Sequence, residues 1–142
     1  MNQVFKTKKT LTFREADPAG IMFFGHIFAL AHDAFEEFIV AAGYGYKEWF
    51  GINEHIIPIR HTEADYLAPF IPGETYDIAV QVAHIGNSSF KMKYHFSQNG
   101  RIHAVVSMVH AVVEFKTMKK AGVPSVLRSR LEPYQEGAHV GI

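Results

Sequence analysis

The residue best placed to do chemistry is Asp17, in the short turn sequence Asp17-Pro18-Ala19-Gly20 that precedes a long apolar helical pattern. A carboxylate beside the free N–H groups of a helix start is able to attack a carbonyl carbon or to activate water for that attack. The same N–H groups, aided by the positive end of the helix dipole, would receive the developing oxyanion. The pattern indicates acyl-transfer chemistry. Asp followed by Pro also favours an ordinary type I turn, so a purely structural role for Asp17 stays open.

Five further residues near this turn are candidates for contact with a substrate. Gly20 and Gly25 carry no side chain, which lets a substrate approach the backbone closely. Phe23 offers an apolar ring ahead of the helix. His26 and His32, on the helix itself, are candidates to line an acyl pocket, although a histidine in such a place is more often an ordinary surface or core residue.

Other constellations give weaker alternatives. Glu36 or Glu37, on the helix, offers a second position for a catalytic carboxylate. His61, Glu63 and Asp65 alternate along one strand face as metal ligands sometimes do, but opposite-charge pairing on a wet face explains them more simply. We therefore expect no metal and no cofactor. Nucleotide hydrolysis and the serine hydrolase mechanism lack support, because the sequence has neither a Gly-rich phosphate loop nor a Gly-x-Ser-x-Gly elbow.

Composition limits the class of protein. The 142 residues, 48% of them hydrophobic, suffice for one core and predict a single domain over residues 1–142. Lys and Arg balance Asp and Glu at 14 each, so no net field attracts nucleic acid. No apolar run reaches the roughly 18 residues of a membrane span, and no signal peptide is evident. With no cysteine in the chain, these features favour a cytoplasmic location and no membrane partner.

The elements that must position Asp17 follow from hydrophobic periodicity. Apolar residues cover most of the circumference of a helix expected from about His26 to Ala42, so this helix must be buried on most sides. Gly43 is placed to end it. A short helix is expected over Ser125–Leu131, and we expect the tail from about residue 132, above all its last ten residues, to be poorly ordered. Period-two alternation predicts five strands, over residues 4–14, 56–67, 76–83, 90–97 and 102–115.

Together these elements predict an α+β fold of the hotdog type, in which a curved antiparallel five-stranded sheet wraps around one long central helix. Asn99-Gly100 is a strong hairpin signal, so the last three strands are expected to form a meander. Two sheet edges remain open in such a fold, which favours a homo-oligomer, a dimer at minimum.

The stretch Asp17-Pro18-Ala19-Gly20-Ile21-Met22-Phe23-Phe24 and its continuation His32-Asp33-Ala34-Phe35-Glu36 resemble the motif of the 4-hydroxybenzoyl-CoA thioesterase family of hotdog enzymes. The branch most similar is that of the 1,4-dihydroxy-2-naphthoyl-CoA thioesterases. This resemblance implies that Asp17 is the catalytic nucleophile or general base and that the Phe24 backbone amide polarises the thioester carbonyl. It also implies dimers with active sites shared between subunits and tetramers built from such dimers, so we expect a tetramer in preference to a dimer.

The sequence departs from that family where basic residues would meet the CoA phosphates, since it has Gly86-Asn87-Ser88-Ser89 there. Phosphate contacts then require other exposed cations. The candidates are Lys91, Lys93, Lys116, Lys119, Lys120, Arg128 and Arg130.

The function expected from the sequence is hydrolysis of an acyl-CoA thioester to the free acid and CoA. The aromatic segment 44–50 is expected to form a loop or a short helical turn. We expect it to lie near the helix start with Phe23, Phe24, Phe28 and Phe35, and these rings favour an aromatic or medium-chain acyl group. Two alternatives stay open: a non-catalytic hotdog module that binds acyl groups or supports assembly, and a thioesterase that acts on acyl-carrier-protein thioesters.

Overall fold

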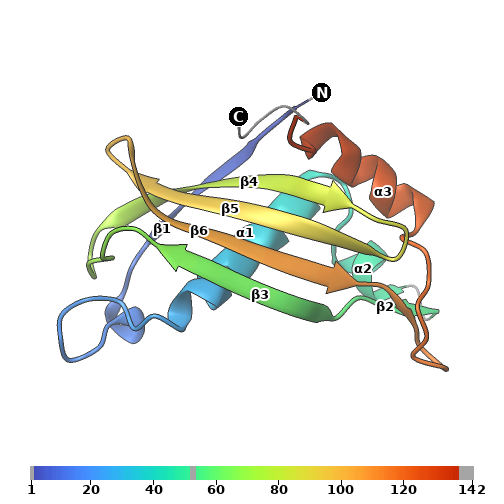
Figure 1. Ribbon diagram of the computed structural model, residues 1–142, viewed down its shortest axis with the longest axis horizontal. Coiled ribbons are helices and arrows are strands. Elements are labelled where there is room, and N and C mark those ends of the chain that lie inside the picture. The colour runs from blue at the N-terminus through green and yellow to red at the C-terminus, as the bar shows by residue number, and fades with distance from the viewer. Residues whose placement is uncertain (1, 52–53, 138–142) are drawn as a thin grey trace.

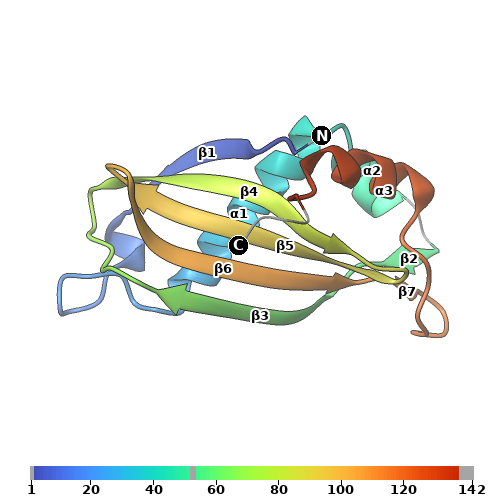
Figure 2. The ribbon, with the colours of Figure 1, turned by 45° about the horizontal axis from the view of Figure 1, so that its top comes forward.

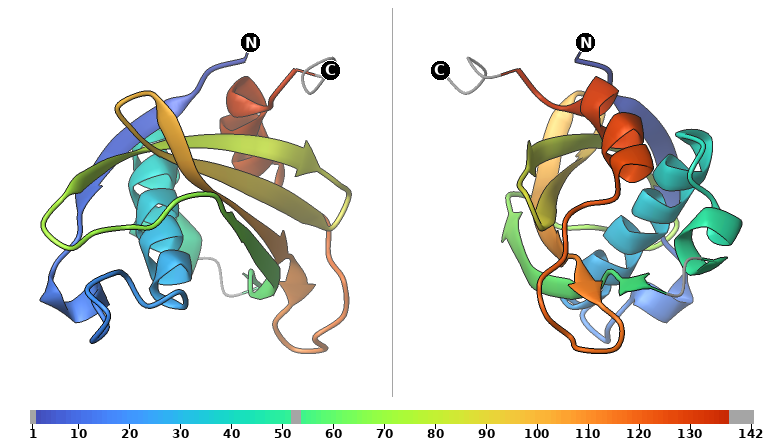
Figure 3. Two further views of the ribbon diagram at one scale, coloured as in Figure 1. Left: turned by 60° about the vertical axis from the view of Figure 1, so that its left-hand side comes forward. Right: turned by 90° about the vertical axis from the view of Figure 1, so that its right-hand side faces the viewer.

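A five-stranded antiparallel sheet curves around one long helix in the computed structural model, which describes residues 2–51 and 54–137 (Figure 1). The strand order is β1-β4-β5-β6-β3, and β2 and β7 form a separate two-stranded sheet. Figures 2 and 3 show α1 inside the curve of the large sheet. The predicted hotdog architecture is confirmed.

The strands are β1 Phe5–Thr10, β2 His55–Ile56, β3 Ile59–Tyr66, β4 Thr75–Ile85, β5 Ser89–Gln98, β6 Arg101–Ala111 and β7 Val113–Glu114. The helices are η1 Phe13–Glu15, α1 His26–Ala41, α2 Tyr46–Gly51, α3 Ser125–Leu131 and η2 Glu132–Tyr134.

The core lies between α1 and the inner face of the sheet. Every second residue of β4 and β5 is buried there, as the period-two pattern predicts. Each fully buried large apolar side chain contributes about 1.5–3 kcal/mol of transfer free energy, so this face accounts for most of the hydrophobic stabilisation. The buried side chains include Ile27, Leu30, Phe35 and Phe38 of α1, Tyr76, Ile78 and Val80 of β4, and Phe90, Met92, Tyr94 and Phe96 of β5.

Strand β6 lies inside the sheet, between β5 and β3. The hairpin from β5 to β6 turns at Asn99 and Gly100, which have φ of 51° and 75°. These left-handed conformations are those that an Asn-Gly hairpin turn requires. The predicted meander of β4, β5 and β6 is therefore confirmed.

Three strand boundaries differ from the prediction. The first strand ends at Thr10 rather than at residue 14, because the chain then turns into η1. The segment expected as one strand over 56–67 is divided at Pro58, which has no N–H to donate to a ladder, so β2 pairs with β7 and only β3 pairs with β6. The segment 102–115 is also divided, at Val112, into β6 and β7. The Val112 N–H donates to the Ser88 carbonyl.

The tail is better held than its composition indicates. Its first helix, Ser125–Leu131, is confirmed. The Pro133 carbonyl accepts a hydrogen bond from the Gln3 N–H at 2.9 Å, and the Tyr134 ring packs 4.9 Å from that of Phe38. Residues of the expected disordered tail thus make these contacts, and its last part, residues 138–142, lies outside the described part of the chain. None of the described helices is long and apolar enough to cross a membrane.

Candidate active site

Asp17 opens a small, tightly hydrogen-bonded hairpin between η1 and α1. Its N–H donates to the Ile21 carbonyl at 2.9 Å, and its carbonyl accepts from the Gly20 N–H at 3.0 Å. Gly20 has φ of +81°, the left-handed residue that completes a three-residue hairpin loop. The Oδ1 atom of Asp17 accepts the Ala19 N–H at 2.8 Å. Asp17 therefore takes part in the turn that its sequence favours.

The turn role leaves the carboxylate available for chemistry. Oδ1 is held by Ala19, whereas Oδ2 has no hydrogen-bond donor within residues 2–51 and 54–137. The Asp17 side chain is half-buried, so it is fixed in direction and still accessible. A carboxylate with one oxygen anchored and one unpaired is suited to act as a base or a nucleophile.

The hairpin is tied to the core by a buried acid that the sequence interpretation missed, Glu15, which is only 5% exposed. Its Oε1 accepts the Thr12 N–H at 2.7 Å and the Thr12 hydroxyl at 2.8 Å. Burial raises the pKa of Glu15, but the hydrogen bonds from Thr12 and the charges of Lys9 and Arg14 outweigh it and hold the pKa below its usual value. The spacing Thr12-x-x-Glu15 is that of a capping box, a signal that was present in the sequence.

Backbone contacts fix the second arm of the hairpin. The Phe23 N–H donates to the Glu15 carbonyl, and the Met22 N–H donates to the Phe70 carbonyl, both at 2.9 Å. The Tyr66 hydroxyl, at the end of β3, donates to the Phe24 carbonyl. The start of α1 is thus held between η1, the segment after β3 and β3 itself.

The Phe24 amide fits the role of an oxyanion donor. Its N–H has no acceptor in the described part of the chain. The residue that caps α1 is Gly25, which has no side chain to bond the first amides, and the first turn contains no acidic residue. Helix N-termini with unpaired N–H groups attract anions and developing negative charge. The arrangement leaves the Phe24 N–H free to bond a ligand, whereas the His26 N–H donates to the Phe23 carbonyl at 3.1 Å.

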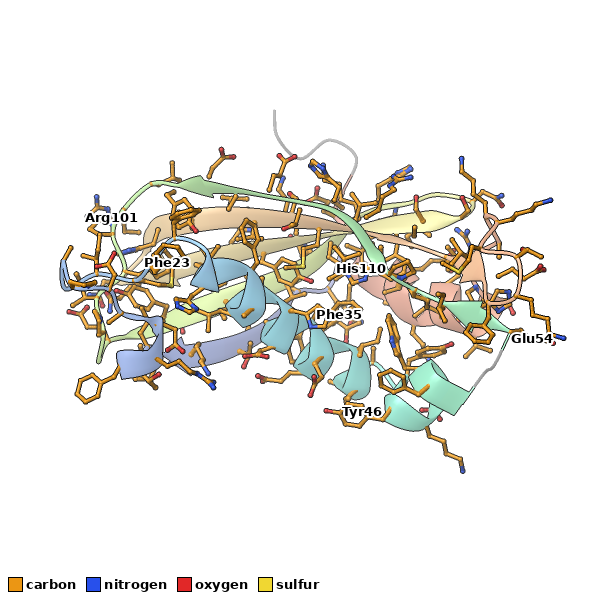
Figure 4. All side chains as sticks on the ribbon, turned by 90° about the horizontal axis from the view of Figure 1, so that it is seen from below. Phe23, Phe35, Tyr46, Glu54, Arg101 and His110 are labelled. Atoms are coloured by element: carbon orange, nitrogen blue, oxygen red, sulfur yellow. The ribbon has the colours of Figure 1, made fainter. Side chains whose placement is uncertain are left out.

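Exposed rings surround the start of α1. Phe24 is 65% exposed, and its ring lies 4.7 Å from that of Phe23, which in turn lies 5.7 Å from the His26 ring. Figure 4 shows Phe23 at this end of the molecule, on the same side as Arg101. A Cβ on Gly25 would come within 3.0 Å of the Phe23 ring. Gly25 therefore leaves room for this ring.

Gly20 is required chiefly by its backbone conformation. A Cβ there would meet no atom of the described chain within 4 Å, but its φ of +81° strains any residue that has a side chain. The close approach of a substrate to Gly20 remains a prediction.

The structure separates the other candidates. His26 lies at the helix start with Asp17, whereas His32 lies six residues further, about 9 Å along the helix axis. Glu37 accepts a hydrogen bond from the Thr7 hydroxyl at 2.6 Å, and Glu36 accepts one from the Tyr46 hydroxyl. Both glutamates are exposed and engaged away from the Asp17 hairpin.

A second group of rings forms a pocket between α1 and α2, which we call the α1–α2 pocket. Most of the aromatic segment 44–50, expected as a loop or a helical turn, belongs to the helix α2. This helix packs against the second half of α1. The Trp49 ring lies 5.6 Å from that of Phe35. The pocket has a volume of about 120 Å³ and adjoins a second one of about 420 Å³. The α1–α2 pocket is lined by His32, Phe35, Glu36, Ile39, Val40, Gly45, Tyr46, Trp49, Phe50 and Ile57.

This division corrects the expectation that all the aromatic residues gather at the helix start. Phe23 and Phe24 lie there, but Phe35 and Trp49 line the α1–α2 pocket, because α2 folds back on the far half of α1.

The candidate cations for CoA phosphates are dispersed. Arg128 donates to the Gly86 carbonyl at 2.7 Å, so it already has a structural contact. The loop after β7, which carries Lys116, Lys119 and Lys120, lies at the opposite end of the molecule from the Asp17 hairpin (Figure 2). Within one chain this loop is remote from the candidate catalytic carboxylate.

The chain is similar to known proteins over most of its length. A family model described as the thioesterase-like superfamily matches residues 11–131. The chain is 27% identical over 129 residues to a 1,4-dihydroxy-2-naphthoyl-CoA hydrolase of Synechococcus elongatus, covering 90% of this chain and 95% of the relative. It is 30% identical over 123 residues to an enzyme of the same name from Prochlorococcus marinus, covering 82% and 79%. A solved 1,4-dihydroxy-2-naphthoyl-CoA thioesterase from Synechocystis has a TM-score of 0.84 at 18% identity, covering 91% of this chain and 96% of that chain.

The match over most of its length shows that the chain belongs to the thioesterase-like superfamily. It is accordingly a hotdog-fold enzyme of the thioester hydrolase class.

Proposed function

We propose that this protein hydrolyses the thioester of an aryl acyl-CoA, with Asp17 as the catalytic carboxylate and the Phe24 backbone amide as the oxyanion donor. One observation carries the proposal: the Asp17 carboxylate, held through Oδ1 by the Ala19 N–H, opens the hairpin that leads directly into the helix start, where the Phe24 N–H has no acceptor among the described residues. A carboxylate and an oxyanion donor are the two groups that thioester hydrolysis requires.

Two routes are compatible with this pair of groups. As a general base, Asp17 would take a proton from water while the oxygen attacks the thioester carbon, and the tetrahedral oxyanion would then collapse and expel the CoA thiolate. As a nucleophile, it would displace the thiolate directly and form an acyl anhydride that water hydrolyses. In both routes the Phe24 N–H stabilises the charge on the carbonyl oxygen.

The α1–α2 pocket supports an aromatic acyl group. Its volume is close to the roughly 150 Å³ of a cavity known to hold one benzene ring, and the adjoining pocket shares Trp49, Phe50 and Ile57 with it. The relatives named above are hydrolases of a hydroxylated bicyclic aryl thioester. We therefore place 1,4-dihydroxy-2-naphthoyl-CoA first among the candidate substrates, and the medium-chain acyl group second.

The test is release of free thiol from a panel of thioesters by the wild-type protein. The panel contains 1,4-dihydroxy-2-naphthoyl-CoA, benzoyl-CoA, hexanoyl-CoA and acetyl-CoA, with one aryl group also presented on an acyl carrier protein. We expect the aryl-CoA thioesters to have the highest kcat/KM. A highest value for acetyl-CoA would refute the aromatic preference, and a preference for the carrier-protein form would favour that alternative substrate. Turnover of none of them would favour a non-catalytic binding module.

The catalytic carboxylate has a rival position on α1. Glu37→Gln and Glu36→Gln separate the two cases, since both side chains bond other residues of the same chain. We expect Glu37→Gln to keep the wild-type kcat and Glu36→Gln, in the wall of the α1–α2 pocket, to change KM more than kcat. A loss of kcat of about 10²-fold in either would move the catalytic carboxylate to the helix.

We also propose a homo-oligomer in the cytoplasm. The strands β1 and β3 are the two edges of the large sheet, and β3 is exposed along most of its length. The absence of cysteine from the sequence agrees with a reducing compartment.

A further inference from the structure

A buried imidazole lies directly behind the α1–α2 pocket. His110, near the end of β6, is only 1% exposed. Its ring is stacked between the rings of Phe35, at 4.6 Å, and Phe90, at 4.8 Å with an interplanar angle of 9°. Figure 4 shows His110 and Phe35 side by side between α1 and the sheet.

Neither ring nitrogen of His110 has a hydrogen-bond partner among the described residues. A buried polar group left unpaired costs about 1–3 kcal/mol. The stacking between two phenylalanines explains the position of the ring but not its two nitrogens, because a phenylalanine would stack as well. The nitrogens therefore indicate a partner other than the protein itself.

The residues beside His110 belong to the pocket wall. The rings of His32 and Trp49 each lie 6.4 Å from the His110 ring, and both residues line the pocket together with Phe35. His32 is exposed on α1, so we expect a change of its rotamer to open the wall toward His110. Burial, and then the nearby charge of His32, lower the pKa of His110 to about 3. The ring is thus neutral near pH 7, with one nitrogen as donor and the other as acceptor.

We infer that His110 is a specificity-determining residue, which hydrogen-bonds a ring hydroxyl of an aryl acyl group seated in the α1–α2 pocket and so selects hydroxylated aryl thioesters over unsubstituted ones. This inference rests on the proposed thioesterase function. A site built to bond a substrate hydroxyl rejects the analogue that lacks it, because its own polar group then stays unpaired. Because the α1–α2 pocket lies on the far half of α1, the inference requires the shared site proposed for the oligomer. His110 of one copy then acts on the choice of acyl group, while the Asp17 hairpin of a second copy acts on the thioester.

The test compares two substrates that differ only in ring hydroxyls, 1,4-dihydroxy-2-naphthoyl-CoA and 2-naphthoyl-CoA. The variant His110→Phe keeps a ring between Phe35 and Phe90 and removes both nitrogens. We expect its kcat/KM for the dihydroxylated substrate to fall at least tenfold, with less than a threefold change for the unsubstituted one. His110→Gln, which retains a donor and an acceptor, should restore part of the selectivity.

The matched control is His95→Phe. His95 is half-buried on β5, on the face opposite the buried Tyr94 and Phe96. The substitution therefore makes the same chemical change as His110→Phe, but away from the pocket. The selectivity of this variant should equal that of the wild type. Unchanged selectivity in a folded His110→Phe protein, or an equal loss of activity on both substrates, would overturn the inference and leave His110 a structural residue.

Failure of the proposed function gives a different result. If the wild-type protein hydrolyses neither thioester, calorimetric binding of the two free acids, 1,4-dihydroxy-2-naphthoic acid and 2-naphthoic acid, decides the role of His110. The inference predicts that the wild type prefers the dihydroxylated acid and that His110→Phe loses the preference. Equal binding of both acids by the wild type would contradict it.

Discussion

At the scale of the residue, Asp17 combines two roles that the sequence presents as alternatives. One carboxylate oxygen closes the turn on the Ala19 N–H, and the other has no donor in the part of the chain that the structure describes. The turn therefore fixes the conformation of the Asp17 side chain. A catalytic group gains from this, since a fixed carboxylate loses little conformational entropy when the substrate binds.

The buried imidazole of His110 predicts a specific dependence of stability on pH. Its pKa is lowered to about 3 by burial and by the charge of His32, from 6.5 for the free side chain. Between these values the unfolded chain binds a proton that the folded chain does not. The contribution of His110 to the free energy of unfolding is thus complete above about pH 6.5 and is lost as the pH falls toward 3.

We expect His110→Phe to lose less stability than the wild type between pH 7 and pH 5. The slope due to one such proton is at most about 1.4 kcal/mol per pH unit. Urea unfolding of both proteins at the two pH values measures the difference. Parallel changes in the two proteins would show that His110 takes up a proton in the folded state.

At the scale of the element, the hairpin that carries Asp17 depends on the positive φ of Gly20. Gly20→Ala places a side chain in a left-handed conformation, which costs about 1–2 kcal/mol. We expect a loss of stability of this size and a lower kcat, because the turn that aims Asp17 is distorted.

The matched control is Gly51→Ala at the end of α2, where a Cβ meets no described atom within 4 Å and φ is not positive. This change should be neutral or slightly stabilising. Thermal unfolding and thioester turnover of the two variants measure both effects. Equal stability of Gly20→Ala and the wild type would show that the hairpin adopts another turn.

Local signals in the sequence predict those elements in which a single force decides the structure. The long helix ends where Gly43, with φ of +90°, is available, and the β5–β6 hairpin turns at Asn99-Gly100. Alternation alone does not show that Pro58 redirects its segment from the large sheet to β7. The packing of α2 against α1 was equally unpredictable from local sequence, because it depends on a tertiary contact between Trp49 and Phe35.

The same distinction applies to the site. The turn and the helix start were predictable, since the groups concerned are close in sequence. His110 was not, because its environment is assembled from α1, α2 and two strands that meet only in the folded chain.

At the scale of the whole molecule, one chain leaves apolar surface around the Asp17 hairpin and the end of β3. Phe13 is 96% exposed, and Phe24, Leu67 and Tyr66 are exposed with it. Large exposed apolar patches on soluble proteins usually mark interaction sites. A second copy that pairs along an open sheet edge would cover this surface and bring its own residues to the hairpin.

We therefore expect a dimer at minimum, and a tetramer in preference to it, with activity lost on dissociation. Light scattering at the concentration of the assay measures the mass. An active monomer of 16.0 kDa would contradict both the oligomer and the shared site.

The most direct test of the account is the turnover number of Asp17→Asn beside that of the wild type on the best aryl-CoA thioester. The asparagine side-chain oxygen is able to accept the Ala19 N–H in place of Oδ1, so the turn and the thermal stability should be retained. The amide cannot serve as base or nucleophile, so kcat should fall by about 10²-fold or more. A folded Asp17→Asn protein with the kcat of the wild type would contradict the assignment of Asp17 as the catalytic carboxylate.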